Sequence, residues 1–486
     1  MNVKEILTLN DVGQQLTLLK KNCNRLTDAD IKKNIRYYWN AHPIKSDPDR
    51  ADQWILDDVT DPITKMTTKE SHKVRRSRLA LPYQQQIVST ACAFTFGNKI
   101  DLILNGDRES EENKKAFELF QDTWDNQIKA MTLLRKVFRI TSVETRCAIN
   151  FYYEDGKIRA KILSLKDGYK IYRHKDENDK LDCVVVEYNK DIIEDGVLKQ
   201  SVPVTEIWTP EFMREIRSGK AMPDIKNPID GGMLLFAFFE QDMPEFEIVK
   251  DLIDNQDYSR SQHSDVNVRI GNPALIVNGN ISKKPRYNDD TKIYEVQPAK
   301  GFEAMSNAKS SMSYLEISSA PESVRMEMTM NDSDIYKFTW PNLYTLLTDS
   351  NFGNLSGQSI RLMFTQAFVK LAEKQEIYDE MIPRMISILK ELTSIATGNK
   401  AVRDLQIGFK YNSLLPDSVS DTVNMLSTAV GAGITSQEQA VRMLSFNTPD
   451  TLDEIEKEGR EKVQVTSADV SPREINPPNE EGINGR

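Results

Sequence analysis

Residues 244–267 constrain the fold most, because this stretch changes from amphipathic to polar halfway along. Its first half predicts a helix that begins near Pro244, with apolar side chains at helical spacing at Phe246, Val249 and Ile253. No glycine or proline interrupts residues 255–267, so the helix is expected to continue, although this half has almost no apolar residues. A helix that is polar all round bridges domains, packs on neighbouring chains or does not form. We therefore expect a helix that starts docked on its own chain and ends without an intrachain partner. The alternative is a surface helix that frays into a loop.

Length and charge limit the class of protein. The 486 residues correspond to roughly two to four packing units. The net charge of -10 excludes long-range attraction to DNA or to an anionic membrane, so any contact with nucleic acid must be local or weak. The four cysteines have no paired spacing, which indicates free thiols in a reducing compartment. The longest apolar run, residues 233–239, is too short to span a membrane, and no membrane partner is expected.

A basic segment precedes the first strongly patterned helix. Residues 41–62 have no periodic pattern and are expected to form a loop. Residues 65–78 are rich in cations and contain one opposing charge, Glu70; the candidate functional residues are Lys73, Arg75, Arg76 and Arg78. A charge run is usually a solvated face, and the alternative is a contact with phosphate or with another subunit.

The middle of the chain combines helices with an antiparallel β unit. Apolar spacing predicts helices over 83–96, 111–126 and 128–142. The period then changes to two, and the pair Asp155-Gly156 predicts a β-hairpin between residues 147–153 and 157–163. Further strands are expected at residues 169–173, 183–188, 204–208 and 233–239.

Two helices are expected to enclose a small insert. Short strands are predicted at residues 273–277 and 292–296, and a second helix returns over 320–336. Both ends of the insert are therefore helices, which predicts a projection with a small α/β unit at its tip.

The last part of the chain is mostly helical. A long helix is expected to begin after Ser356, to kink at Pro383 and to stop at Gly398. Shorter helices are predicted over residues 417–430, 437–444 and 449–463. Residues 466–486 have almost no apolar content and are expected to be disordered.

No catalytic or metal-binding pattern stands out. The four histidines lie far apart, and none has a zinc-like spacing from a cysteine or another histidine. The chain has neither a phosphate-binding Gly-x-x-x-x-Gly-Lys loop nor a His-Glu-x-x-His helix. We therefore expect neither a cofactor nor a metal.

Several stretches are together similar to one family. Residues 78–97, RLALPYQQQIVSTACAFTFG, resemble the Arg-hydrophobic, Ile-Val, Phe-Gly signature of the portal proteins of tailed double-stranded-DNA bacteriophages. Residues 247–258, EIVKDLIDNQDY, resemble the first stem helix of that family, and residues 354–362, NLSGQSIRL, resemble the segment that opens its long helix. Residues 435–444 and 453–458 are similar to its helical crown.

The resemblance implies an α+β portal fold, assembled as a ring of about twelve copies around a DNA channel at one capsid vertex. The implied regions are an α/β wing at 1–243 and 356–410, stem helices at 244–267 and 320–336, a small α/β clip at 268–319, a tunnel loop at 337–355, a helical crown at 411–465 and a disordered tail at 466–486. On this map, neighbouring stem helices and the channel surround the polar helix.

The same resemblance implies a function and partners. The protein would be a non-enzymatic conduit for DNA packaging and ejection, in the virion and, during assembly, in the host cytoplasm. Its implied partners are other copies of itself, the terminase large subunit, the major capsid protein, a head-completion or adaptor protein and non-specifically passing double-stranded DNA.

Two sets of site residues follow from this map. The basic segment is expected in the wing at a subunit boundary. The tunnel loop has no apolar period and is expected not to be core, so its aromatic residues should pack on neighbouring subunits while its asparagines contact passing phosphates. The candidates are Trp340, Asn342, Tyr344, Asn351, Phe352 and Asn354.

Two rival functions remain open on the sequence. One is a nucleic-acid-processing enzyme without a recognisable motif, and the other is an intracellular scaffold protein. The resemblance and the lack of a ligand cluster disfavour the enzyme, and a closed ring would distinguish the portal from the scaffold.

Overall fold

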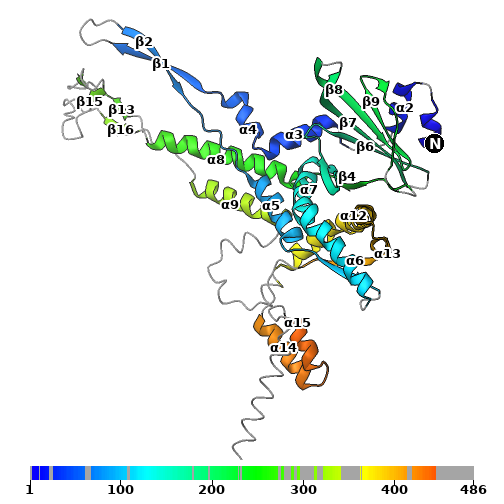
Figure 1. The fold of residues 1–486 in the computed structure, drawn as a ribbon. Helices are drawn as coiled ribbons and strands as arrows, with labels where there is room; N and C mark the ends of the chain where they lie inside the picture. Colours follow the sequence, from blue (N-terminus) through cyan, green and yellow to red (C-terminus); the bar gives the residue numbers. More distant parts are fainter. Residues whose placement is uncertain are drawn as a thin grey trace, which may run out of the picture. The chain divides into compact units, whose positions relative to one another are not determined.

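The computed structural model (Figure 1) describes residues 3–9, 11–20, 26–60, 67–106, 110–177, 180–194, 197–227, 229, 232–271, 275–278, 286–288, 293–295, 311–314, 321–340, 362, 364–412 and 419–444. The chain divides into two compact units, one with residues 1–352 and 363–414 and the other with residues 353–362 and 415–486. Helices and sheets both contribute to the first unit, which confirms the predicted α+β class.

One antiparallel sheet of the first unit is covered on both faces. Its strands are β6 Lys170–Lys175, β7 Leu181–Glu194, β8 Val197–Trp208, β9 Phe212–Arg217, β10 Lys220–Ala221 and β11 Ile225–Lys226. On β7, Cys183 and Val185 pack against α1 Val3–Leu7 and α2 Val12–Leu19. The alternate residues Val184 and Val186 pack on the other side, in a cluster with Phe236. Burial on both faces explains why residues 183–186 of this strand form a continuous apolar run.

The predicted hairpin is confirmed in a second sheet of order β12-β4-β5. It joins β4 Arg146–Glu154 to β5 Lys157–Leu163, with β12 Phe236–Glu240 on the other side of β4. The turn residues Asp155 and Gly156 have φ angles of 51° and 75°, as a two-residue hairpin turn with both residues left-handed requires.

A helical layer forms the rest of this core. Its elements are α5 Tyr83–Phe96, α6 Glu111–Asp122, η2 Thr123–Gln127, α7 Ala130–Glu144 and α12 Thr365–Thr397, followed by α13 Ala401–Asp404. The ring of Tyr378 on α12 lies 4.7 Å from Phe96, 5.7 Å from Phe138 and 5.5 Å from Phe239, measured between ring centroids. Beside these helices, β3 Asp101–Asn105 pairs with β17 Gln406–Lys410.

The ends of α12 test the prediction for the long helix. The helix ends before Gly398, whose φ of 71° is the left-handed conformation expected of a glycine stop, and Pro383 lies inside it. Ser356, expected to begin the helix, lies outside the described residues. The described cysteines Cys92, Cys147 and Cys183 are buried free thiols, as predicted.

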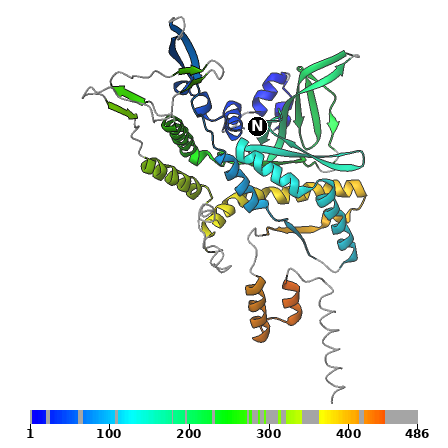
Figure 2. The ribbon, with the colours of Figure 1, turned by 90° about the vertical axis from the view of Figure 1, so that its left-hand side faces the viewer.

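Two long helices, α8 Lys250–Gly271 and α9 Pro321–Phe338, lie side by side and run in opposite directions (Figures 1 and 2). They confirm the two predicted helices, although the first begins with the 3-10 turn η3 Glu247–Val249 and not at Pro244. Between them, β13 Leu275–Asn278 pairs with β16 Ser311–Tyr314, and β14 Arg286–Asn288 pairs with β15 Ile293–Glu295.

The loop prediction for residues 41–62 is wrong. This stretch contains α4 Pro43–Ser46, η1 Pro48–Arg50 and β1 Gln53–Thr60, and β1 pairs along its length with β2 Thr67–Val74. Because Val74 is the only apolar residue of β2, its sequence has no apolar alternation, and the pattern of β1 alone does not show that a partner strand follows.

The second unit contains two described helices, α14 Val419–Gly431 and α15 Gln437–Met443. Both agree with the predicted helices. The predicted helix at 449–463 and the predicted disordered tail lie outside the described residues.

Glu144 is a buried carboxyl at the end of α7. Its side chain is 2% exposed, and Oε2 accepts hydrogen bonds from the backbone N–H groups of Leu165 at 2.8 Å and Lys166 at 3.3 Å. Burial raises the pKa of Glu144 from 4.5 to about 7, against the opposing effect of these two hydrogen bonds. A carboxyl with a raised folded-state pKa binds its proton more tightly in the folded state, so its contribution to stability is lost as pH rises from 4.5 to 7.

We therefore predict that Glu144→Gln flattens the pH dependence of stability. The glutamine can accept the same two hydrogen bonds but cannot ionise. Between pH 5 and pH 8 the free energy of unfolding of the wild type should fall by about 2 to 3 kcal/mol relative to the variant. Denaturant titrations at both pH values measure this difference, and parallel pH profiles for the two proteins would contradict it.

Candidate functional site

The buried face of α8 is polar over residues 256–265. Gln256, Asp257 and Ser261 are each fully buried, and Asp265 continues the same face one turn further on. We call these four residues the polar seam. Buried polar groups need hydrogen-bond partners, so the seam must be matched by donors and acceptors of other elements.

An extended segment, residues 77–81, supplies the donors. The backbone N–H groups of Leu81, Leu79 and Ser77 donate to Asp257 Oδ1, Ser261 Oγ and Asp265 Oδ1, each at 2.8 Å. Four residues of helix rise about 6.0 Å and two residues of extended chain about 6.6 Å, so acceptors spaced i, i+4, i+8 match amides spaced i, i+2, i+4. The helix thus provides the acceptors that a neighbouring strand would otherwise provide.

Arg50 closes the far end of this ladder. Its guanidinium donates to the backbone carbonyl of Ser77 at 2.9 Å and to Asp265 Oδ2 at 2.6 Å. The carboxylate of Asp265 is therefore shared between a backbone amide and a charged side chain, which orients it.

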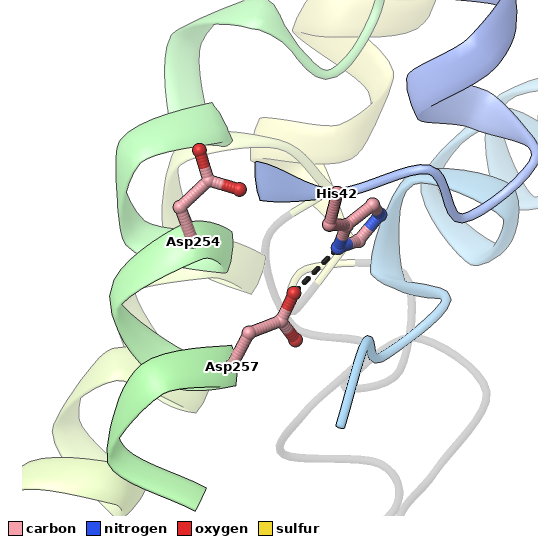
Figure 3. A group of neighbouring side chains, drawn as sticks. All are labelled: His42, Asp254 and Asp257. Atoms are coloured by element: carbon pink, nitrogen blue, oxygen red, sulfur yellow. Dashed lines mark hydrogen bonds and ion pairs between the residues drawn. The ribbon is translucent and has the colours of Figure 1, made fainter. Parts of the chain in front are cut away.

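A histidine closes the near end of the ladder (Figure 3). His42, just before α4, has its Nδ1 2.5 Å from Asp257 Oδ2, and its ring stacks on Tyr37 of α3 Asp28–Tyr38 with centroids 4.3 Å apart. The hydroxyl of Tyr37 donates to Asp254 Oδ1 at 2.9 Å. Burial, followed by the charge of Asp254, raises the pKa of Tyr37 well above its usual value, so this hydroxyl remains a donor.

Among the described residues, one group of side chains has ligand atoms close enough together to hold a metal ion. It consists of His42, Asp254 and Asp257, whose ligand atoms lie within 4.8 Å of one another. Most of their polar atoms are engaged by this chain: Nδ1 of His42 faces Asp257, Asp257 accepts from Leu81, and Asp254 accepts from Tyr37. Nε2 of His42 is buried and has no hydrogen-bond partner among the described residues. The arrangement is therefore that of a hydrogen-bonded junction between α8 and the N-terminal segments.

The other side of the seam contacts α9. Gln256 Nε2 donates to the carbonyl of Met328 at 3.2 Å and to Asp332 Oδ1 at 2.8 Å, and Arg260 lies 3.2 Å from Asp332 Oδ2. The hydroxyl of Tyr83 on α5 also donates to Asp332. Asp332 therefore joins α5, α8 and α9.

The expectation that the polar half of this helix lacks an intrachain partner is wrong. Its buried face is matched by polar groups of residues 37–81 and of α9. Apolar periodicity detects only apolar burial, and it therefore missed His42, Arg50 and Asp257. The sequence does carry a signal for this polar face. Polar residues recur at every fourth position, at Asp257, Ser261 and Asp265, and this spacing places them on one face of a helix.

The described side chains of the basic segment, Lys73 to Arg78, do not form one cationic cluster. Lys73 Nζ lies 3.0 Å from Asp52 Oδ2, and the guanidinium of Arg78 donates to the backbone carbonyl of Arg50 at 2.7 Å. The ammonium of Lys73, followed by the backbone N–H of Arg76, holds the pKa of Asp52 below its usual value. Arg75 is exposed. Two of the four candidates therefore serve contacts within the chain.

Trp340 is buried, so the expectation that the segment 337–355 places its aromatics outside the core is wrong for this residue. Trp340 is 1% exposed and stacks on Phe94 of α5 at 5.2 Å between centroids. Phe364, just before α12, lies 5.7 Å from the same Phe94 ring. The sequence gives no sign of this burial because Phe94 lies far from both residues along the chain. Asn342, Tyr344, Asn351, Phe352 and Asn354 lie outside the described residues.

Among the described residues, no helix combines the length and the hydropathy that crossing a lipid bilayer requires.

Comparison with known families identifies the class of protein. A family model described as "Phage portal protein, SPP1 Gp6-like" matches residues 19–465. The chain therefore belongs to this family of phage portal proteins, whose members are structural proteins of the virion. This confirms the resemblance found in the sequence motifs.

Two solved structures are similar at low identity. One, titled "Neck of empty GTA particle computed with C6 symmetry", is 10% identical with a TM-score of 0.40 and covers 75% of this chain and 90% of that chain. The other, titled "Virion of native gene transfer agent (GTA) particle", is 10% identical with a TM-score of 0.40 and covers 76% of this chain and 91% of that chain. No curated protein matches the chain.

The seam leads to a prediction about Asp257. Asp257→Ala leaves the N–H of Leu81 and the imidazole of His42 buried without their acceptor, which should lower the free energy of unfolding by about 2 to 5 kcal/mol. The amide of Leu81 should also exchange with solvent faster. Asp251→Ala, which removes an exposed carboxylate from the first turn of the same helix, is the matched control and should cost less than about 0.5 kcal/mol. Equal stability of the two variants, with unchanged hydrogen exchange at Leu81, would show that the ladder does not hold the segment.

Proposed function

We propose that this portal protein forms a closed ring of about twelve copies around a channel, through which genomic DNA is packaged and later ejected. The observation that carries this proposal is the family match over residues 19–465, which covers both projecting helices and the core. The net charge of -10 suits a conduit, because a channel that bound phosphate tightly would hold its cargo.

Exposed apolar side chains support the ring. Met326 and Met330, one turn apart on α9, are 65% and 54% exposed. Ile248 on η3 and Val268 on α8 flank the seam and are 62% and 64% exposed. Since the polar seam is satisfied within the chain, these residues, and not the seam, are what a neighbouring copy would cover.

The partners follow from the conduit. The ring would receive the terminase large subunit during packaging, contact the major capsid protein at its vertex and later carry a head-completion or adaptor protein. Assembly would take place in the host cytoplasm. We propose no enzymatic activity. The rival function, a nucleic-acid-processing enzyme, would need a reactive group that a substrate can reach, whereas His42 and Asp257 are buried and join α8 to residues 37–81 through hydrogen bonds.

Within the ring we assign the regions as wing, stem, clip, tunnel loop and crown, with α8 and α9 as the stem. The burial of Trp340 changes the assignment of the tunnel loop in one respect: Trp340 is its anchored root. Tyr344 and Phe352 would contact neighbouring copies, and the asparagines would contact passing phosphates; duplex DNA presents no unpaired base for aromatic stacking.

We predict that the basic segment lies at a boundary between copies. The wild type should form closed rings of roughly 0.7 MDa, from about twelve chains of 55.6 kDa. Charge reversal by Arg75→Glu with Arg76→Glu should weaken assembly, whereas Lys114→Glu with Lys115→Glu, an exposed pair on α6, should not. Particle mass in solution measures this. A monomeric wild type under all conditions would contradict the ring, and intact rings that fail to package DNA would reassign the segment to DNA.

We also predict that residues 342–351 act in the channel and not in assembly. Shortening the chain between Asn342 and Asn351 should leave the ring intact and impair DNA packaging or retention. A variant of unchanged length, with Gly and Ser at residues 343–350, separates the effect of length from that of side chains. Ring mass and packaged DNA are measured on the same preparation, and normal packaging and retention by the shortened protein would refute the assignment.

A further inference from the structure

A buried carboxylate lies where the chain enters the stem. Glu245 is 1% exposed in its side chain, with Oε2 2.5 Å from Lys374 Nζ and Oε1 3.8 Å from Lys370 Nζ. The two lysines lie one turn apart on α12 and are themselves 17% and 18% exposed. The backbone N–H of Glu245 donates to the carbonyl of Ser142 on α7 at 2.9 Å, which fixes the residue to a second helix of the core.

One of these lysines, Lys370, also reaches the root of the second stem helix. Lys370 Nζ lies 5.8 Å from the centroid of Trp340, which follows the end of α9. Trp340 in turn stacks on Phe94, and Phe364 at the start of α12 lies against that ring. Lys370 therefore contacts the roots of both stem helices, Glu245 before α8 and Trp340 after α9.

Stability alone does not account for a charged group here. An ion pair taken out of water loses hydration that its mutual attraction only partly restores, and well-packed apolar residues are often at least as stable. Burial lowers the pKa of Lys370, and the charge of Glu245 opposes that shift. What the ionic contacts add is placement. Neither carboxylate oxygen of Glu245 has a hydrogen-bond partner among the described residues, so this buried charge is compensated only where the two lysines of α12 lie beside it.

We propose that Glu245, Lys370 and Lys374 form a positioning site that sets the direction in which the stem helices α8 and α9 leave the core helices α7 and α12. The proposal rests on the proposed function for its consequence, because the placement of the stem helices defines the channel of a portal ring. The geometry itself does not depend on that function and can be measured without DNA.

The test is a distance between α8 and α12. Spin labels at two exposed positions, Gln262→Cys and Glu376→Cys, report this distance. The native cysteines of the labelled chain are replaced, and labelled chains are diluted with unlabelled chains before assembly. Glu245→Lys places three cations together and should shift or broaden the distance distribution. The exchanged pair, Glu245→Lys with Lys374→Glu, should restore the wild-type distribution. Asp251→Lys, the same charge change at an exposed site of α8, should leave it unchanged.

The outcomes separate the proposal from its alternatives. An unchanged distribution in Glu245→Lys, or a shifted one that the exchanged pair does not restore, would overturn it. If Glu245→Lys does not fold, Glu245→Gln takes its place, because it removes the charge at nearly constant shape. This variant should broaden the distance distribution, and an unchanged distribution would overturn the proposal. DNA retention by the same variants is a second readout. A wild type that forms no DNA-conducting ring would refute the proposed function, while the distance result would still decide the positioning site.

Discussion

The hydrogen bonds between the polar seam and residues 77–81 are the constraint on which the surrounding structure depends. Within the described part of the chain, no strand pairs with the amides of Ser77, Leu79 and Leu81, whose hydrogen bonds are partly buried. An amide left without an acceptor where water cannot reach it would cost about 1 to 3 kcal/mol. Helix α5 begins directly after this segment, and hairpin β1–β2 ends directly before it. The seam therefore fixes where α8 lies relative to both.

A hydrogen-bonded seam specifies one register, whereas an apolar stripe can accept several. It also limits its own length. Each step of the ladder accumulates about 0.6 Å of mismatch between helix rise and extended chain, so the match worsens with every added step. The next amide of the alternation, that of Tyr83, donates to the carbonyl of Leu81 at 2.9 Å, and the next residue of the helix face, Ile253, has no side-chain acceptor. His42 and Arg50 occupy the two ends of the ladder. Sequence and geometry thus end the ladder at the same place.

Local chemistry made much of the fold predictable. The turn pair Asp155-Gly156 specified its hairpin, Gly398 specified the end of α12, and the apolar run of β7 indicated a strand, because each signal lies within a few residues. The seam could not be predicted in the same way. Its partners lie 176 to 188 residues apart in the sequence and are joined by polar groups, to which apolar periodicity is blind. Trp340 was misjudged for a related reason: only the fold brings Phe94 to it. The tunnel-loop asparagines remain a prediction.

The placement of the cations bears on how an acidic chain can handle DNA. From the sequence, residues 65–78 form a strong basic run that could hold phosphate. In the structure, Lys73 is paired with Asp52, and Arg78 is turned toward the backbone of Arg50. Two cations of this segment therefore hold the end of hairpin β1–β2 beside the start of the seam. The positive electrostatic potential that a phosphate would meet is therefore weaker than the sequence of residues 65–78 suggests. A conduit needs such a weak potential if duplex DNA is to pass without being held.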